Sequence, residues 1–192
     1  MANLRVLVLY AHPNHDISRA NRMLRAAIED APGVTVHDLY DCYPDLFIDV
    51  RREQRLLLEH DVLVFQHPMH WYSAPAILKE WEDSVLENGW AYGKGGEKLH
   101  GKRFMQVVTT GAHEDSYRHG GKAHFTVHEL LRPFEQMAYY CGMVHLPPFV
   151  THDARELDDR AIAAQAARYR ALLEKIHHGD PPAPFHTIPG KD

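Results

Sequence analysis

The sequence has few cysteines and no long apolar run, and both absences narrow the class of protein. Its two cysteines, Cys42 and Cys141, lie far apart and outside any C-x-x-C pattern. This disfavours a structural zinc site, a redox dithiol and a disulfide framework. No apolar stretch is long enough to cross a bilayer. A strand-like run begins at Leu4 with no basic leader before it. We therefore expect a cytoplasmic protein.

An excess of positive charge is also missing. The chain has 21 lysines and arginines against 26 aspartates and glutamates, a formal net charge of -5. No global basic field would draw it to nucleic acid or anionic lipid, so we expect no nucleic-acid partner. The 16 histidines are scattered without a recurring ligand spacing. Because metal ligands need convergent geometry as well as suitable side chains, the histidines do not predict a metal site.

Two common nucleotide-binding motifs are absent. No G-x-G-x-x-G follows the first apolar run, and no G-x-x-x-x-G-K-[ST] occurs in the chain. The first absence argues against a dinucleotide-binding Rossmann domain, and the second argues against an NTPase. A phosphate near the first run would therefore be held by hydroxyl, amide and imidazole groups.

The sequence does contain a regular alternation of short apolar, β-rich runs with segments of helical period. The predicted strands are Leu4–Tyr10, Val34–Leu39, Asp61–His67, Arg103–Thr110 and Met143–Val150. The predicted helices are Ser18–Glu29, Arg51–Glu59, Ala74–Glu87, Val127–Tyr140 and Asp158–His177. The first and third strands are continuously apolar, which is typical of strands covered by helices on both faces.

This alternation predicts an α/β fold with a parallel sheet and right-handed crossovers. We expect a flavodoxin-like three-layer sandwich whose five-stranded parallel sheet has the order 2-1-3-4-5. It would form one domain, residues 1–178, followed by an extended, proline-rich tail, residues 179–192. This strand order has a switch point between strands 1 and 3, so a ligand should bind at the carboxyl ends of those strands.

The loop after the first strand is a candidate phosphate site. Ser18 is a good N-cap for the following helix, whose free N–H groups and positive dipole end attract anions. His12, Arg19 and Asn21 would add hydrogen-bond donors. The alternative is that Ser18 and Asn21 only cap the helix and His12 fills a turn.

The loop after the third strand is rich in large apolar side chains. It places Pro68, Met69, His70, Trp71 and Tyr72 at a sheet end, where a buried core has little need of them. A flat isoalloxazine ring needs an apolar platform for its face, which Trp71 and Tyr72 would supply, and backbone donors for its edge. The alternative is that these aromatics pack onto the next helix.

The loop after the fourth strand would complete the site. Gly111, between Thr110 and Ala112, permits close approach of the backbone to a ligand. The Tyr117 phenol would hydrogen-bond to charge that develops on a flavin or an acceptor. The alternative is a flexible loop with incidental polar residues. The stronger argument is that this topology brings three such loops to one crevice.

Taken together, these residues resemble the NAD(P)H:quinone oxidoreductase family over most of residues 4–150. The likeness lies in Tyr10–Pro13 with Ser18 and Asn21, in Gln66–Pro75 and in Thr109–Ala112. A further set resembles its small bacterial branch, the ancillary proteins of glutathione-regulated potassium-efflux systems. That set is Val36–Tyr40, Tyr43–Asp49, Arg52–Gln54, Leu78–Trp81, Gly89–Gly96 and Leu131–Glu135.

The resemblance implies a role for each loop. His12, Ser18 and Asn21 would hold the flavin phosphate. Residues 68–71, with Tyr72, would line the isoalloxazine, residues 110–112 would close its other side, and Tyr117 would match the family's active-site tyrosine. Better-known members have a histidine six residues after the tyrosine, where this chain has Ala123. A tyrosine–histidine relay is therefore not predicted.

The resemblance also implies chemistry and partners. The cofactor would be FMN, with FAD as the alternative, and NADH or NADPH would be the cosubstrate. A quinone would be reduced by two electrons in a ping-pong exchange, with the N–H groups of residues 110–112 and Tyr117 stabilising the developing charge. The protein would be a homodimer, with Trp90 and Tyr92 either in the dimer contact or packed on the core. The rival function is a regulatory subunit docked on a potassium-efflux transporter, which would place it peripherally on the inner membrane.

Overall fold

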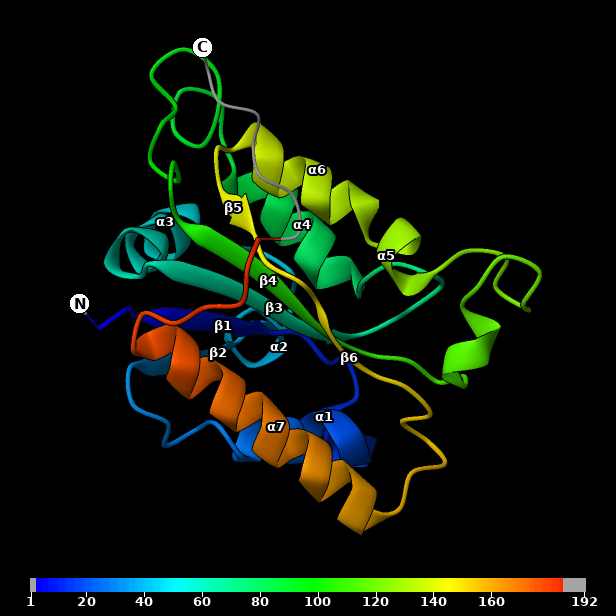
Figure 1. Cartoon of the computed structure of the whole chain (residues 1–192). Coiled ribbons are helices and arrows are strands. Elements are labelled where there is room, and N and C mark those ends of the chain that lie inside the picture. The colour runs from blue at the N-terminus through cyan, green and yellow to red at the C-terminus, as the bar shows by residue number, and fades with distance from the viewer. Residues whose placement is uncertain (1–2, 185–192) are drawn as a thin grey trace.

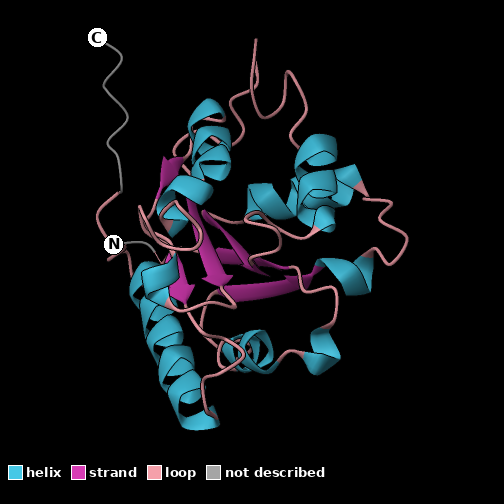
Figure 2. Cartoon of the chain, turned by 90° about the vertical axis from the view of Figure 1, so that its right-hand side faces the viewer, coloured by secondary structure: helices cyan, strands magenta, loops and turns pink. Residues whose placement is uncertain are grey.

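The computed structural model describes residues 3–184 and shows an open, twisted sheet between two layers of helices. The sheet is seen nearly edge-on in Figure 2, with helices on both sides of it. This confirms the predicted flavodoxin-like three-layer sandwich. Of the predicted tail, residues 185–192 lie outside the described residues.

The elements follow one another in the expected alternation (Figure 1). The strands are β1 (Val6–Tyr10), β2 (Val34–Asp38), β3 (Val62–Pro68), β4 (Arg103–Thr109), β5 (Val144–His145) and β6 (Phe149–Thr151). The α-helices are α1 (Arg19–Ala26), α2 (Leu39–Cys42), α3 (Val50–Glu59), α4 (Ala76–Val85), α5 (Val127–Leu130), α6 (Arg132–Tyr140) and α7 (Asp159–His177). Short 3-10 helices are η1 (His15–Ile17) and η2 (Glu114–Ser116).

The sheet has the predicted parallel order, β2-β1-β3-β4-β5, with β6 also paired to β4. Tyr10 at the end of β1 lies beside Gln66 in β3, and Pro68 at the end of β3 lies beside Thr109 in β4. The carboxyl ends of these three strands therefore share one edge. The loops that follow them begin next to one another, as the switch-point argument requires.

The continuously apolar strands are buried on both faces because their side chains alternate between two cores. Val6 and Val8 of β1 point into a cluster with Leu24 of α1 and Tyr169 of α7. Leu7 and Leu9 of β1 point into the other cluster. That second cluster includes Ile77, Leu78 and Trp81 of α4 and Phe134 and Ala138 of α6. In Figure 1, α1 and α7 lie below the sheet and α4 and α6 lie above it.

The predicted fifth strand, residues 143–150, is interrupted. It forms β5 and β6, which pair with successive parts of β4. Pro147 and Pro148 lie between them and have no N–H to donate to the ladder, so pairing stops there and resumes at Phe149. The prediction of one continuous strand was wrong on this point.

The predicted helix over residues 127–140 is also divided. α5 ends at Leu130 and α6 begins at Arg132, with Pro133 in the first turn of α6. Proline is tolerated in a first turn but not in a helix interior, so the chain starts a new helix there. The short helix α2 was not predicted. Asp38 begins it, because its carboxylate accepts the N–H groups of Tyr40 and Asp41.

The fold gathers no metal-binding cluster and has no membrane-spanning helix within residues 3–184. Within residues 3–184, no group of three or more histidine, cysteine, aspartate or glutamate side chains is placed to hold a metal ion. None of the helices in that range has both the length and the apolar content that crossing a membrane requires. Trp90 and Tyr92 are partly buried and pack against the core, and Tyr92 also contacts Tyr140.

Candidate functional site

A pocket of about 400 Å³ opens at the shared carboxyl edge of β1, β3 and β4. That volume lies within the usual range for small-molecule sites. Its walls come from the three loops singled out in the sequence and from one further loop. The lining residues are His12, Asn14, Ile17, Ser18, Arg19, Ala20, Asn21, Pro68, Met69, His70, Thr109, Thr110, Gly111, Ala154 and Arg155.

The N-terminus of α1 forms one wall. Ser18 occupies the N-cap position, but its side chain makes no hydrogen bond to the helix N–H groups. The first N–H groups of any α-helix lack intrahelical acceptors, and they carry the positive end of the helix dipole. Because the cap side chain does not satisfy them, this wall offers backbone donors to an anion in the pocket.

The two polar residues that follow Ser18 are already engaged with protein. Arg19 donates to the Leu157 carbonyl at 3.0 Å and to the Asp159 carboxylate at 2.7 Å, which ties α1 to the start of α7. Asn21 is buried, and its amide donates to the Thr109 hydroxyl at 2.7 Å. Asn21 therefore joins the helix wall to the end of β4.

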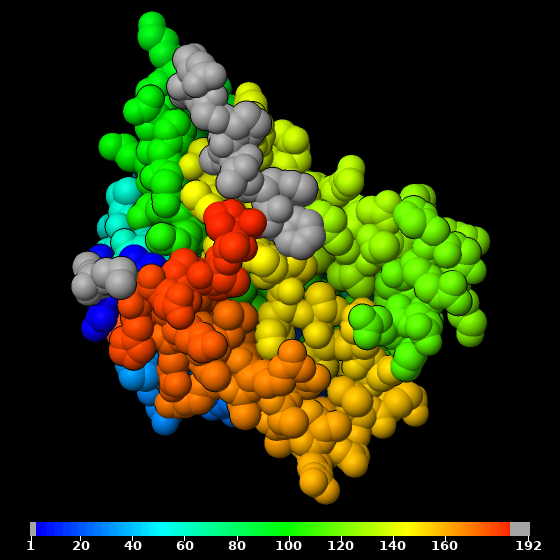
Figure 3. Space-filling view, in the orientation of Figure 1, coloured from blue at the N-terminus to red at the C-terminus, as the bar shows by residue number. Residues whose placement is uncertain are grey.

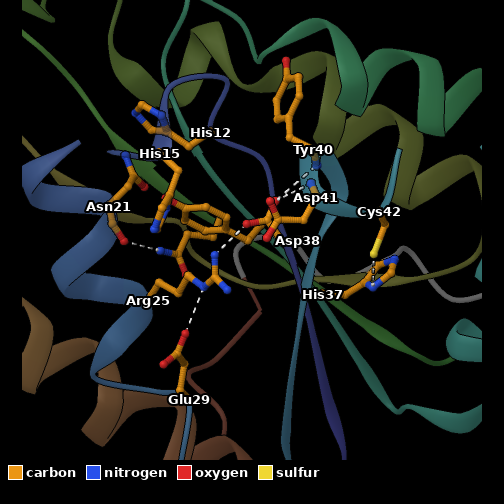
Figure 4. A network of polar contacts seen from close by, with 12 residues as sticks. His12, His15, Asn21, Arg25, Glu29, His37, Asp38, Tyr40, Asp41 and Cys42 are labelled. Atoms are coloured by element: carbon orange, nitrogen blue, oxygen red, sulfur yellow. Dashed lines mark hydrogen bonds and ion pairs between the residues drawn. The ribbon is translucent and has the colours of Figure 1, made fainter. Parts of the chain in front are cut away.

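His12 lies in the same wall as a neutral ring. Burial lowers the pKa of His12 to about 4, and the neighbouring His70 and His15 contribute to the shift. The Asn14 N–H points at His12 Nδ1 at 3.1 Å, so the ring proton resides on Nε2. His12 can thus act as a neutral donor. Figure 4 shows it on the loop that leads from β1 toward the helix bearing Asn21.

Some residues of the loop after β3 line the pocket, and others lie on the surface. Pro68, Met69 and His70 line the pocket, whereas Trp71 and Tyr72 are not among the lining residues. His70 and Ser73 exchange both backbone hydrogen bonds around a tight turn. Its two central residues have positive φ values of 47° and 62°.

This turn determines where the aromatics go. Positive φ at both central positions is usual for a two-residue turn but strained for large side chains. The turn holds the Trp71 side chain 94% exposed and the Tyr72 side chain half exposed. Trp71 therefore does not pack onto the following helix. Within the single chain, neither aromatic forms a wall of the pocket.

Of the backbone N–H groups in the loop after β4, some already donate to protein and others do not. The Thr110 N–H already donates to the Thr151 carbonyl at 2.9 Å. No backbone hydrogen bond of the Gly111 or Ala112 N–H group occurs within residues 3–184. A Cβ on Gly111 would meet no protein atom closer than Arg155 Nε, at 3.8 Å. Protein packing therefore does not require a glycine at this position.

The segment over residues 113–125, which contains η2, projects from the body of the molecule (Figures 1 and 3). Tyr117 follows η2 and is not a lining residue of the pocket. It packs against His152, with ring centroids 5.6 Å apart. His152 Nδ1 is 3.0 Å from the Thr110 hydroxyl, which donates its own proton to the Ala112 carbonyl. The hydroxyl can therefore only accept from His152, so the ring proton is on Nδ1. Burial lowers the pKa of His152, which leaves the ring neutral with a lone pair on Nε2.

Several of these residues were not found by sequence reasoning. Ala154, Arg155 and His152 follow β6, whose carboxyl end lies at the same sheet edge as that of β4. The sequence could have indicated these residues, because the loop that follows a fifth parallel strand also begins at that edge. Asn14, Ile17 and Thr109 lie within or next to the loops already considered.

Known proteins with similar sequences identify the family to which the chain belongs. Residues 4–173 match the family model described as flavodoxin-like fold. The chain is 44% identical over 174 residues to an uncharacterized NAD(P)H oxidoreductase of Bacillus subtilis (strain 168), covering 91% of this chain and 100% of that one. It is 48% identical over 169 residues to a glutathione-regulated potassium-efflux system ancillary protein of Enterobacter sp. (strain 638), covering 88% and 92%.

Solved structures are also similar to this chain in sequence and fold. General stress protein 14 of Treponema denticola, solved in complex with FMN, is 39% identical with a TM-score of 0.86, over 90% of this chain and 99% of that one. An NADPH-quinone reductase from P. pentosaceus is 33% identical with a TM-score of 0.80, over 91% and 98%. The chain belongs to the flavodoxin-like fold family, in the group that contains these NAD(P)H oxidoreductase and potassium-efflux ancillary relatives.

Proposed function

We propose that the protein is an FMN-dependent NAD(P)H:quinone oxidoreductase that reduces quinones by two electrons in a ping-pong exchange. The observation that carries this proposal is the pocket at the β1, β3 and β4 edge. It combines an anion-attracting helix end with a wall at Gly111, where no side chain projects into the pocket. The relative solved with FMN and the relative named as a quinone reductase support the choice of cofactor and acceptor.

The residues present fit a flavin mononucleotide. The phosphate would take the N–H groups at the start of α1, with the Ser18 hydroxyl and His12 Nε2–H as further donors. The ring would lie between the Pro68–His70 backbone and Gly111, where a side chain is absent. FAD is the alternative, and the mass of the extracted cofactor would distinguish the two.

The chain's own backbone and side-chain groups would position the flavin and stabilise the negative charge that develops on it. A bound flavin supplies the chemistry of accepting hydride from a nicotinamide and passing two electrons to a quinone. The Gly111 and Ala112 N–H groups would donate to negative charge at the ring edge. Tyr117 would donate a hydrogen bond to the same region or to the acceptor. His152, locked with its proton on Nδ1 by Thr110, would orient Tyr117 by packing against its ring.

Ser18→Asp separates a capping role from a phosphate-binding role. Aspartate is as good an N-cap as serine, so the free energy of unfolding should stay the same or rise. Its negative charge would repel the phosphate, and FMN affinity should fall on the order of tenfold. FMN titration and chemical denaturation of the same sample measure both quantities. Undiminished FMN affinity would remove the phosphate from this helix end.

Tyr117→Phe tests the phenol. Loss of a hydrogen bond to developing charge should lower the rate of quinone reduction about tenfold, since such a bond contributes roughly 1.5 kcal/mol. FMN affinity should change less than the rate, because this hydrogen bond would form to charge that develops only during the reaction. His152→Gln should cost less and should shift the pH profile of the same step. If Tyr117→Phe turns over at the native rate, Tyr117 has no part in the reaction.

The activity itself is tested by mixing the FMN-loaded protein with NADPH or NADH and menadione. We expect oxidation of the nicotinamide that depends on the quinone, with parallel initial-velocity lines when the two substrates are varied. Intersecting lines would rule out the ping-pong order. The absence of quinone-dependent oxidation with either nicotinamide would rule out the proposed activity.

A second role is favoured by the 48% identity to a potassium-efflux ancillary protein. On this proposal the protein also docks peripherally, as a regulatory subunit, on the cytoplasmic side of a potassium-efflux transporter. The exposed Trp71 would be covered either by that partner or by the second subunit of a homodimer. Light scattering of the purified protein tests the dimer. Potassium efflux from cells that lack the protein tests the transporter role.

A further inference from the structure

Cys42 lies outside the pocket, and two nitrogen-bearing side chains contact its sulfur. It ends α2 and is partly buried. Its Sγ atom is 3.8 Å from His37 Nδ1 and 3.7 Å from the Arg52 guanidinium. His37 comes from β2 and Arg52 from α3, so separate elements bring both groups to the sulfur. Figure 4 shows the Cys42 side chain directed at the His37 ring.

His37 is held by a buried carboxylate. Its Nε2 is 2.8 Å from Glu53 Oε1, and Glu53 is fully buried. Glu53 also accepts the Tyr43 hydroxyl at 2.6 Å and the Trp81 indole N–H at 2.8 Å. Burial alone would raise the pKa of Glu53, but the hydrogen bonds from His37, Tyr43 and Trp81 hold it below its usual range. Glu53 is therefore a carboxylate.

This carboxylate determines which nitrogen of His37 faces the thiol. Because Glu53 can only accept, the proton on His37 Nε2 points at Glu53, and the lone pair of the neutral ring is on Nδ1. The Cys42 proton can then pass to Nδ1, which places an imidazolium between the thiolate and the Glu53 carboxylate. A nucleophile next to a base, with an acidic side chain that orients the base, is the arrangement that activates weak nucleophiles in proteins.

Cys42 has two basic side chains and one acidic side chain near its sulfur. Arg52 and His37 lie within 4 Å of the sulfur. From its own segment, Asp41 opposes a negative sulfur, but that side chain is exposed and screened by solvent. Tyr43 is neutral and donates to Glu53. Cys141 offers a contrast, because it is 2% exposed and burial raises its pKa to about 11.

We propose that Cys42 is a reactive thiol that low-molecular-weight disulfides modify by thiol–disulfide exchange. The Cys42 thiolate attacks one sulfur of the small disulfide, a new S–S bond forms at Sγ, and the original S–S bond breaks. The Cys42 thiol is oxidised to a mixed disulfide, and the departing sulfur is reduced to a thiolate. That thiolate takes the proton that His37 Nδ1 received from Cys42, so atoms and electrons balance.

The test is the rate at which 4,4′-dithiodipyridine modifies the intact, folded protein, followed by absorbance and mapped by mass. We expect one fast thiol, at Cys42, because it is partly exposed with a base and a guanidinium within 4 Å of its sulfur, whereas Cys141 is buried. Cys42→Ser should abolish the fast phase and Cys141→Ser should preserve it. Equal rates at the two cysteines, or a faster reaction at Cys141, would overturn the proposal.

Variants of the two neighbours identify the cause of the reactivity. Arg52 is exposed, so Arg52→Gln should fold normally and slow the reaction at pH 7 about threefold or more, whereas Arg52→Lys should retain most of the rate. His37→Asn should also slow the reaction, because it removes the base that takes the Cys42 proton. If His37→Asn does not fold, the two Arg52 variants decide the question. Equal rates for Arg52→Gln and the native protein would contradict the proposed activation.

Discussion

Replacing Gly111 by valine is expected to weaken FMN binding by about tenfold to a hundredfold while leaving the fold intact. A Cβ at this position would meet no protein atom closer than 3.8 Å, so the protein itself has room for it. A bound ring would not, because Gly111 lines the pocket. Forcing extra methyl groups against a filled site costs roughly 1–3 kcal/mol, which corresponds to that loss of affinity.

A graded series makes the Gly111 experiment decisive. Gly111→Ala should give an intermediate affinity for FMN, measured by quenching of flavin fluorescence, and the free energy of unfolding should stay within about 0.5 kcal/mol of the native value. If the valine variant binds FMN as tightly as the native protein, the ring does not approach Gly111. If both variants are instead destabilised without FMN, the glycine serves the fold and not the ligand.

Replacing Glu53 by alanine is expected to cost about 3–5 kcal/mol of stability, a large part of the 5–15 kcal/mol typical of a whole domain. The carboxylate is fully buried and accepts from His37, Tyr43 and Trp81. Its removal leaves these three groups buried without an acceptor and opens a cavity. Denaturant unfolding followed by circular dichroism measures the loss.

Two controls accompany the Glu53 measurement. Glu59→Ala, on the same helix but exposed, should change stability by less than about 0.5 kcal/mol. Because the pKa of Glu53 is depressed in the folded protein, its contribution is present above about pH 4.3 and is lost as pH falls through the folded value. The native protein should therefore lose its advantage over Glu53→Gln in acid. An equal difference at pH 3 and pH 7 would show that the carboxylate is not charged.

The layered fold could be predicted from the sequence because its signals are local. Continuous apolar runs such as residues 6–9 identify strands covered on both faces, and the alternation with helical segments fixes a parallel sheet. The breaks at Pro147–Pro148 and at Pro133 were visible as residues, but their outcome depends on pairing. β4 lies alongside both halves of the interrupted strand, so the chain rejoins the same ladder after the prolines.

The candidate site could be predicted only in part. His12, Ser18 and Gly111 line one pocket, because the carboxyl ends of neighbouring parallel strands must share an edge. Side-chain direction could not be foreseen. The tight turn at residues 70–73 turns Trp71 into solvent, and the Asn21 amide is taken by Thr109. His152 and Tyr117 are far apart in the sequence, so no local sequence pattern predicts their contact.

Titration of the cofactor-free protein with FMN tests the central claim most directly. We expect saturation at one FMN per chain with a dissociation constant at or below the micromolar range, together with competition by inorganic phosphate at high concentration. A protein that binds neither FMN nor FAD in this titration, while remaining folded by circular dichroism, would contradict the assignment of this pocket to a flavin.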